Sequence, residues 1–375
     1  MPVVRVRGTR REMGIQHGRK TKDLIQRAVK QAWNTIPGLL KISKSDISRD
    51  LEQYSDWISR CHSGFRDEME GVAEGARARY DDIVLLNSQY DIMLSRGGER
   101  AVETLLCSAF AAWQRATRYR DVVAGHNDDG PRFTDQFLVL LDGKPRDGHR
   151  FLIPVVPGFI GYHTVVNDAG FCAFGNSLEN GPVPQEAGVG VPMYVIFRYL
   201  AEFADGVESA LQFINNVRLG IVCSFLLTDR TGNAAIVHKT PNNVAVIRPT
   251  HDFLVLTNHA LVEEVKPHLI MREYPSSSHF RFQSMEKAVK RNLGRIDLNR
   301  GMDIMSTHYD SSVGRDNPSG NTPCRHCEYE GRLSGTCRSG VVNLGKRRIK
   351  LSIALGNPCI AQWIEIKMNY RAIDS

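Results

Sequence analysis

The chain has 375 residues, of which 42% are hydrophobic and 24% charged, an ordinary globular composition that excludes a fibrous or intrinsically disordered protein. Lys and Arg number 48 against 41 for Asp and Glu, and the net charge of +7 is scattered apart from one basic cluster at residues 346–350. Without a basic stripe or a recognisable nucleic-acid module, we expect no nucleic-acid partner.

No run of about 18 apolar residues occurs, so we expect no membrane-spanning segment and no membrane partner. The first residues lack the apolar centre of a secretory signal, and residues 373–375 are not the Ser-Lys-Leu type of peroxisomal signal. The expected location is therefore the cytoplasm. There the eight cysteines are expected to be thiols and not disulfides.

The first hundred residues are expected to be mainly helical. Apolar residues recur at helical spacing in residues 20–33 and 46–76, and neither segment contains proline. Acidic residues then precede an apolar face at residues 83–87, which is typical of a helix start. Gly97 and Gly98 break this helical pattern.

Short β-like runs dominate from Cys107 onward. Strands are expected at residues 108–113, 121–125, 136–141, 151–156, 162–166, 171–174, 222–228, 234–238, 253–256, 349–355 and 361–368. Helices are expected at residues 193–203, 207–215 and 277–292. Residues 310–340 are rich in Ser, Gly, Asn and Arg and are expected to form a long surface loop.

Runs of strands with helices gathered between them favour a layered α+β sandwich over a doubly wound fold. No G-x-G-x-x-G follows an expected strand, and no Walker loop occurs. We therefore expect no cofactor.

Cys107 stands where the helical part gives way to the sheet-rich part. One interpretation is a plain core residue, because cysteine is among the most often buried residue types. The other is a nucleophile, since carboxylates and amides follow nearby strands at residues 126–129 and 257–259. A nucleophile, a carboxylate and an amide donor are the groups that acyl transfer requires.

Further short motifs occur along nearly the whole chain, in the same order as in a known protein family. They lie at residues 12–18, 68–75, 85–91, 107–110, 127–129, 257–259, 324–326, 336–339 and 355–359. Together they resemble the acyl-coenzyme A:6-aminopenicillanic acid acyltransferase family of the N-terminal-nucleophile hydrolase superfamily.

The resemblance implies a four-layer αββα sandwich whose precursor cuts itself between Leu106 and Cys107. Residues 1–106 would become a helical chain that stays bound to the sheet-rich residues 107–375 as an αβ heterodimer, the two forming one composite domain. The new α-amine of Cys107 would then act as base for its own thiol, because an α-amine titrates near the pKa of a thiol. The substrate would be a small acyl donor, either an N-acyl amide or an acyl-CoA.

The resemblance also assigns roles to other residues. Asp129 would orient or activate the amine, and Asn258 would donate to the oxyanion. Arg325 would pair with a substrate carboxylate, since a guanidinium fork fits that group, and Asn127 would contact the substrate.

Three positions depart from the family pattern. Leu106 stands where the acyltransferase has glycine, Asp128 stands where the motif has tryptophan, and His126 replaces an arginine or glutamine. Asp128, followed by Gly130 where the motif has an aromatic residue, indicates a different acyl or amine pocket, and Leu106 is expected to slow the self-cleavage. They also keep open an alternative function, in which the chain is an uncleaved, non-catalytic member of the fold that binds a partner.

Cys324, His326, Cys327 and Cys337 are candidate zinc ligands in the expected loop. They contain one Cys-x-x-Cys pair, whereas a closed structural zinc site needs four ligands, typically two such pairs. No His-Glu-x-x-His motif is present either. We therefore expect loop thiols and no metal.

Overall fold

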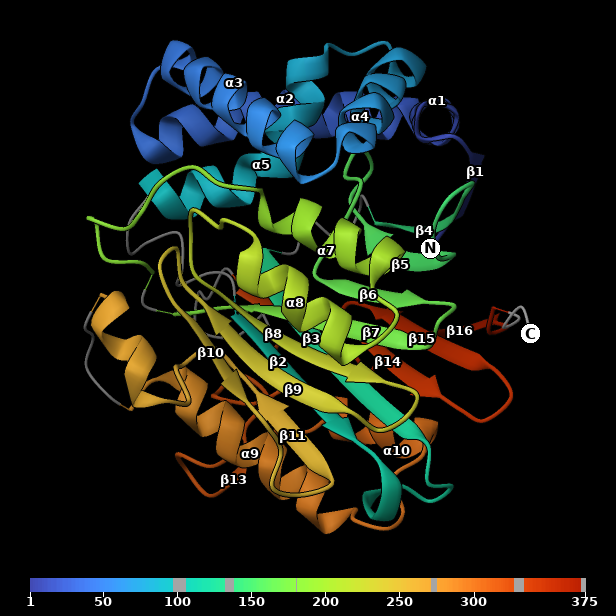
Figure 1. Ribbon diagram of the computed structural model, residues 1–375. Helices are drawn as coiled ribbons and strands as arrows, with labels where there is room; N and C mark the ends of the chain where they lie inside the picture. Colours follow the sequence, from blue (N-terminus) through green and yellow to red (C-terminus); the bar gives the residue numbers. More distant parts are fainter. Residues whose placement is uncertain (97–105, 132–137, 180, 271–274, 327–333, 372–375) are drawn as a thin grey trace.

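Two β-sheets packed face to face form the centre of the molecule, and helices cover the outer face of each sheet (Figure 1). The structure is a computed structural model that describes residues 1–96, 106–131, 138–179, 181–270, 275–326 and 334–371. Its layers follow the order helix, sheet, sheet, helix, so the expected αββα sandwich is confirmed. Gly97, Gly98 and residues 136 and 137, for which a helix end and a strand start were expected, lie outside the described residues.

The N-terminal part forms five helices, drawn in blue and cyan in Figure 1. They are α1 (Arg10–Lys20), α2 (Lys22–Leu40), α3 (Lys44–Cys61), α4 (Ser63–Ala76) and α5 (Tyr80–Arg96). Capping boxes start α1 and α3, each with a hydroxyl and a carboxylate three residues apart. The single helix expected over residues 46–76 is in fact two, because His62 has an extended backbone between α3 and α4.

The first sheet has eight strands in the order β1-β4-β5-β6-β7-β8-β9-β10. Their bounds are β1 (Val3–Gly8), β4 (Val139–Pro145), β5 (Phe151–Val155), β6 (Thr164–Asn167), β7 (Phe171–Ser177), β8 (Cys223–Asp229), β9 (Ala234–Lys239) and β10 (Val244–Ile247). The expected β8–β9 hairpin is confirmed. Strand β1 was not expected. It lies parallel to β4, so the mainly helical part also contributes an edge strand to the sheet.

Helices α7 (Met193–Phe203) and α8 (Val207–Asn216) agree with the expected helices and pack on the outer face of this sheet. Their apolar sides join those of α1–α5 in the largest hydrophobic core of the described residues. Helix α7 contacts α5, which links the N-terminal helices to the sheet-rich part.

The second sheet has six strands in the order β11-β2-β3-β14-β15-β16. Their bounds are β2 (Leu106–Ala112), β3 (Val122–Pro131), β11 (Phe253–Leu256), β14 (Ser334–Leu344), β15 (Ile349–Leu355) and β16 (Trp363–Met368). Strand β14 corrects the last part of the expected loop over residues 310–340, because residues 334–340 are strand, while residues 327–333 lie outside the described residues. Its first half is polar because Thr336 and Arg338 face buried charges, and this composition resembles that of a loop.

Helices α9 (Ser277–Arg291) and α10 (Leu298–Met305), drawn in orange, cover the outer face of the second sheet (Figure 1). A separate core lies between the sheets and contains small side chains of β2, including Ala109 and Ala111. No helix of the described ranges combines the length and the apolar character needed to cross a membrane.

Candidate active site

Cys107 is the second residue of β2, a central strand between β11 and β3. Its side chain is 4% exposed, and it lies directly opposite Asp128 of β3. The Cys107 Sγ is 3.9 Å from the nearer carboxylate oxygen of Asp128. Because opposite residues of an antiparallel pair share a face, both side chains point to the same side of the sheet.

The main chain of Cys107 is held from both ends. Its backbone N–H donates to Asn258 Oδ1 over 3.0 Å, and its carbonyl oxygen accepts from Arg281 Nη1 over 2.5 Å. Arg281 Nη2 also donates to Asn258 Oδ1 over 2.7 Å. A peptide N–H and a guanidinium can only donate, so the Asn258 atom between them has to be its oxygen.

The Asn258 amide nitrogen consequently points the other way. Its Nδ2 donates to the carbonyl oxygen and the hydroxyl of Ser177, over 2.9 and 3.0 Å. In this chain, therefore, Asn258 holds the backbone nitrogen of Cys107, while its donor group is engaged by Ser177.

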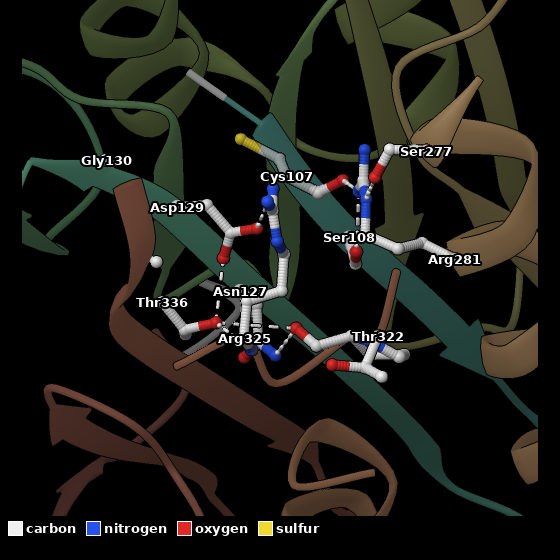
Figure 2. A network of polar contacts seen from close by, with 12 residues as sticks. Cys107, Ser108, Asn127, Asp129, Gly130, Ser277, Arg281, Thr322, Arg325 and Thr336 are labelled. Atoms are coloured by element: carbon white, nitrogen blue, oxygen red, sulfur yellow. Dashed lines mark hydrogen bonds and ion pairs between the residues drawn. The ribbon is translucent and has the colours of Figure 1, made fainter. Parts of the chain in front are cut away.

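Asp129 lies on the opposite face of β3 from Asp128 and is fully buried. Its Oδ1 accepts from the Thr336 hydroxyl over 2.8 Å, and its Oδ2 is 3.9 Å from Arg325 Nη1. Figure 2 shows this group with the Cys107 sulfur pointing away from the Asp129 carboxylate. Burial raises the pKa of Asp129, while Arg325, Arg281 and the Thr336 hydrogen bond oppose the rise.

Two polar atoms at this point have no hydrogen-bond partner among the described residues. They are Asp129 Oδ2 and Arg325 Nη1, and both are buried. Buried polar atoms are nearly always satisfied, so this gap is a place where a further polar group would be stabilised. Leu106 pairs with Asp129 across the strands, so the residue before Cys107 lies opposite the residue that carries this unsatisfied oxygen.

The thiol of Cys107 is neutral in this environment. Burial, followed by the nearby Asp129 carboxylate, raises its pKa to about 12, although Arg281 and Arg338 act in the opposite direction. A thiolate and not a thiol is the effective nucleophile, so Cys107 requires a nearby base before it can attack.

Asp128 is the centre of a second polar cluster on the thiol side. It forms an ion pair with Arg338 of β14, and its Oδ2 lies 3.2 Å from His163 Nε2 and 3.5 Å from the Tyr162 hydroxyl. Burial lowers the pKa of His163 to about 3, so this imidazole is neutral near pH 7. The cluster therefore carries one carboxylate and one guanidinium.

A small enclosed cavity separates Cys107 and Asp128 from the first sheet and α7. It is lined by Cys107, Asp128 and the hydroxyl-bearing residues Tyr90, Tyr162, Ser177 and Tyr194, together with His163, Gly175 and Met193. Its volume of about 20 Å³ is enough for roughly one water molecule. This cavity is thus too small for a molecule much larger than water.

The structure brings Leu106, Cys107, Asp129, Asn258 and Arg325 together, as expected of one site. Asn127 lies next to them, but its amide group braces the surrounding backbone. Its Nδ2 donates to the carbonyl oxygens of Met305 and Pro323, each over 2.8 Å. Contact between Asn127 and a substrate stays a prediction.

Two charged residues of the site, Arg281 and Arg338, were given no role in the sequence, and Asp128 was noted only as a departure from the family motif. Arg281 could have been found, because it falls on the same helical stripe as the buried Ser278, Met285 and Val289 of α9. An arginine on a buried stripe needs a buried partner. Arg338 lies in the family-like motif at residues 336–339, but no role was assigned to it because the segment that contains it was interpreted as a loop.

Comparison with known proteins gives the following similarities. Residues 116–311 match the family model described as acyl-coenzyme A:6-aminopenicillanic acid acyl-transferase, a segment that starts after Cys107. An uncharacterized protein of Archaeoglobus fulgidus is 24% identical over an alignment of 368 residues, and this alignment covers 86% of this chain. The chain spans about 60% of the length of that curated relative.

Two solved structures are similar at lower identity. One is an N-acylethanolamine-hydrolyzing acid amidase orthologue of Caenorhabditis elegans, with 13% identity and a TM-score of 0.44, covering 64% of this chain and 93% of that chain. The other is penicillin V acylase from Agrobacterium tumefaciens, with 13% identity and a TM-score of 0.39, covering 70% of this chain and 86% of that chain.

Proposed function

This chain belongs to the acyl-coenzyme A:6-aminopenicillanic acid acyl-transferase family, and we propose that it is a self-cleaving cysteine amidohydrolase or acyltransferase. The observation that carries the proposal is the hydrogen bonding around Cys107. Its backbone nitrogen is bound by a fully buried asparagine, and the residue before it lies opposite a buried aspartate of the neighbouring strand. A plain core cysteine needs neither arrangement.

Self-cleavage begins with attack of the Cys107 sulfur on the carbonyl carbon of Leu106. A thioester forms, the C–N bond breaks, and the Cys107 nitrogen takes up a proton to become an amine. Water then hydrolyses the thioester, which releases the Leu106 carboxylate and restores the thiol. Asn258 Oδ1 already accepts from this nitrogen, so it is placed to hold the amine that the cleavage creates.

Turnover uses that amine as the base that the buried thiol lacks. An α-amine has a pKa near 8, so it can take the proton of the thiol near neutral pH. The thiolate attacks the carbonyl of an N-acyl amide or acyl-CoA and forms an acyl-enzyme, and the amine or CoA thiol leaves with the proton. Water or a second amine then removes the acyl group from Cys107.

Asp129 supports the charged form of the amine, since a carboxylate stabilises a neighbouring ammonium group. Its Oδ2, which has no hydrogen-bond partner among the described residues, and its place opposite Leu106 in the neighbouring strand support this assignment. Arg325 Nη1 lies 3.9 Å from Asp129 and has no hydrogen-bond partner among the described residues, so the guanidinium has a donor left for a substrate carboxylate. Donation by Asn258 to the oxyanion stays a prediction, because its Nδ2 donates to Ser177 and its Oδ1 accepts from the Cys107 nitrogen.

Access to the thiol also follows from cleavage. The present cavity of about 20 Å³ holds roughly one water molecule, far below the volume of about 300 Å³ or more that is typical of ligand pockets. Cutting after Leu106 frees the chain end that lies opposite Asp129. We infer that the departure of this end opens the site to the acyl donor.

The competing function is that of an uncleaved binding protein, and Leu106 and the closed cavity are the features that favour it. Denaturing gels and intact-mass measurement separate the two functions. The purified wild type is expected to give two fragments, residues 1–106 and 107–375, and Cys107→Ala is expected to remain one piece. Cys172→Ala is the matched control, because Cys172 is equally buried but lies in the facing sheet.

A fragment that begins at Cys107 in the wild type, and its absence in Cys107→Ala, is the expected result. If Cys107→Ala is still cut at the same bond, the thiol is not responsible. A wild type that stays intact after prolonged incubation favours the binding function. Exposure of the cleaved protein to an acyl-CoA and to an N-acyl amide should add the acyl mass to the 107–375 fragment only while Cys107 is present.

A further inference from the structure

Four side chains that can bind a metal come from three segments far apart in the sequence and meet next to Arg325. His308 follows α10, Cys324 and His326 flank Arg325, and Cys359 follows β15. Their ligand atoms, two imidazole nitrogens and two thiol sulfurs, all lie within 4.8 Å of one another. Cys324 is buried and the other three are half-buried, so the cluster is screened from solvent.

The separations between these atoms match a tetrahedron around a metal ion. His308 Nε2 is 3.1 Å from His326 Nε2, and the two sulfurs, of Cys324 and Cys359, are 3.6 Å apart. His326 Nε2 lies 3.3 Å from Cys359 Sγ and 3.9 Å from Cys324 Sγ. Zinc bonds of about 2.0–2.1 Å to nitrogen and about 2.3 Å to sulfur give tetrahedron edges of roughly 3.4 Å between nitrogens and roughly 3.8 Å between sulfurs.

The backbone fixes this arrangement independently of any ion. The Cys324 N–H donates to the Thr307 carbonyl over 3.1 Å, and the His326 N–H donates to the Pro318 carbonyl over 3.0 Å. Asn357, two residues before Cys359, donates to the Arg325 carbonyl oxygen. The three segments are therefore joined next to the ligands, which gives the cluster a preformed geometry.

We propose that His308, Cys324, His326 and Cys359 bind one Zn²⁺ ion as a structural site. Two thiolates and two imidazoles in a tetrahedral arrangement are the ligand set that selects zinc among common biological metals. All four positions are filled by protein, which is the pattern of a structural site and leaves no open position for catalysis. Binding releases the two thiol protons to solvent.

This ligand set differs from the one considered in the sequence. Cys337 points elsewhere, with its Sγ 2.8 Å from the Gly130 carbonyl oxygen, and Cys327 lies outside the described residues. His308 and Cys359 take their places, although 16 and 35 residues of chain separate them from Cys324. No short motif could have identified them.

The metal would affect the active site through residues 323–326, the segment that carries two of its ligands. Arg325 stands between two of the ligands and reaches Asp129, and the Pro323 carbonyl accepts from Asn127. Zinc would thus fix the position of the cation beside Asp129. In this scheme Arg325 helps to position the Asp129 carboxylate. The zinc proposal does not depend on whether Cys107 is a nucleophile.

Elemental analysis of the purified full chain tests the site directly. We expect about one equivalent of zinc in the wild type and loss of most of it in Cys359→Ser and in His308→Gln. Cys327→Ser is the matched control from the same segment and should keep its zinc. After removal of zinc with a chelator, added Co²⁺ should give the visible bands of tetrahedral cobalt bound to thiolates in the wild type and in Cys327→Ser only.

The proposal is overturned by a folded wild type that binds neither zinc nor Co²⁺, with folding checked by circular dichroism. Zinc lost in Cys327→Ser but kept in Cys359→Ser would contradict this ligand set. Peptide mapping that finds a disulfide between Cys324 and Cys359 would also overturn it. Should Cys359→Ser fail to fold, His308→Gln decides, because it leaves both thiols in place.

Discussion

At the scale of single residues, the two neighbouring aspartates of β3 have different partners on opposite faces of the strand. Asp128 faces the thiol and is paired with Arg338, whereas Asp129 faces the opposite side and contacts Arg325 and Thr336. Alternation along a strand produces this division, since adjacent residues point to opposite faces. Asp129 has an oxygen without a hydrogen-bond partner among the described residues, and so it is the carboxylate available to a new amine.

Asp129→Asn is expected to keep the fold and to slow acylation of Cys107 by about a hundredfold or more, because an amide cannot stabilise an ammonium as a carboxylate does. The oxygen of the introduced amide can still accept from Thr336, which preserves one of the native contacts. Rates of acyl-adduct formation measured by mass spectrometry, together with melting temperatures, test this expectation.

Asp128→Asn is the companion variant. It leaves the buried Arg338 without its carboxylate, and breaking a buried ion pair in this way costs about 3–5 kcal/mol of unfolding free energy. We therefore expect a lower melting temperature from this change. If Asp128→Asn instead abolishes acylation with an unchanged melting temperature, while Asp129→Asn remains active, the roles of the two aspartates are reversed.

At the scale of elements, α5 and α7 are joined by a buried carboxylate. Asp91 of α5 accepts from the Met193 N–H, the first of α7, over 3.1 and 3.2 Å. A carboxylate at a helix N-terminus is favourable, yet Asp91 is only 1% exposed. Burial outweighs the hydrogen bonds and raises the pKa of Asp91 to about 8.

This shift makes the stability of the junction depend on pH. Between about pH 4 and pH 8 the folded chain keeps the Asp91 proton and the unfolded chain has lost it, so unfolding free energy should fall as pH rises through this range. The amide introduced by Asp91→Asn is neutral in both states at every pH. We expect this variant to gain at least about 1 kcal/mol over the wild type between pH 5 and pH 8, measured by urea unfolding. Equal pH profiles for the two proteins would show that Asp91 ionises normally in the fold.

At the scale of the whole molecule, the parts before and after Cys107 share both a sheet and a core. Strand β1 pairs with β4 along six residues, and the helices α1–α5 bury their apolar faces with α7. A fully buried ion cluster adds to this interface, since Arg198 of α7 pairs with Glu68 of α4 over 2.9 Å and with Glu202. None of these contacts depends on the peptide bond before Cys107.

The two fragments of the cleaved chain are consequently expected to remain together. Size-exclusion chromatography without denaturant should elute residues 1–106 and 107–375 in one peak, at the position of the uncleaved Cys107→Ala chain. Separation should require enough urea to unfold the shared core. Release of the first fragment under native conditions would show that the interface is weaker than its buried contacts indicate.

Sequence patterns alone determined the layered architecture and the classes of many elements, but not those of β1, β10, α10 and β14. Helical periodicity identified α7, α8 and α9, and alternation with turn residues identified the β8–β9 hairpin. The change from helical spacing to short β-like runs placed Cys107 at the start of the sheet-rich part. These features are local, because side-chain periodicity and capping act over a few residues. Ordered motifs added the family, whose model matches residues 116–311.

Only the tertiary structure decided which polar groups meet. Arg281 reaches Cys107 across 174 residues of chain, and Cys359 reaches Cys324 across 35. The polar half of β14 resembles a loop in composition, yet it is a central strand because its charges find partners on β3. Such residues carry no periodic signal of their own: burying a charge is costly unless a partner is present, and that partner is supplied by distant parts of the chain only after folding.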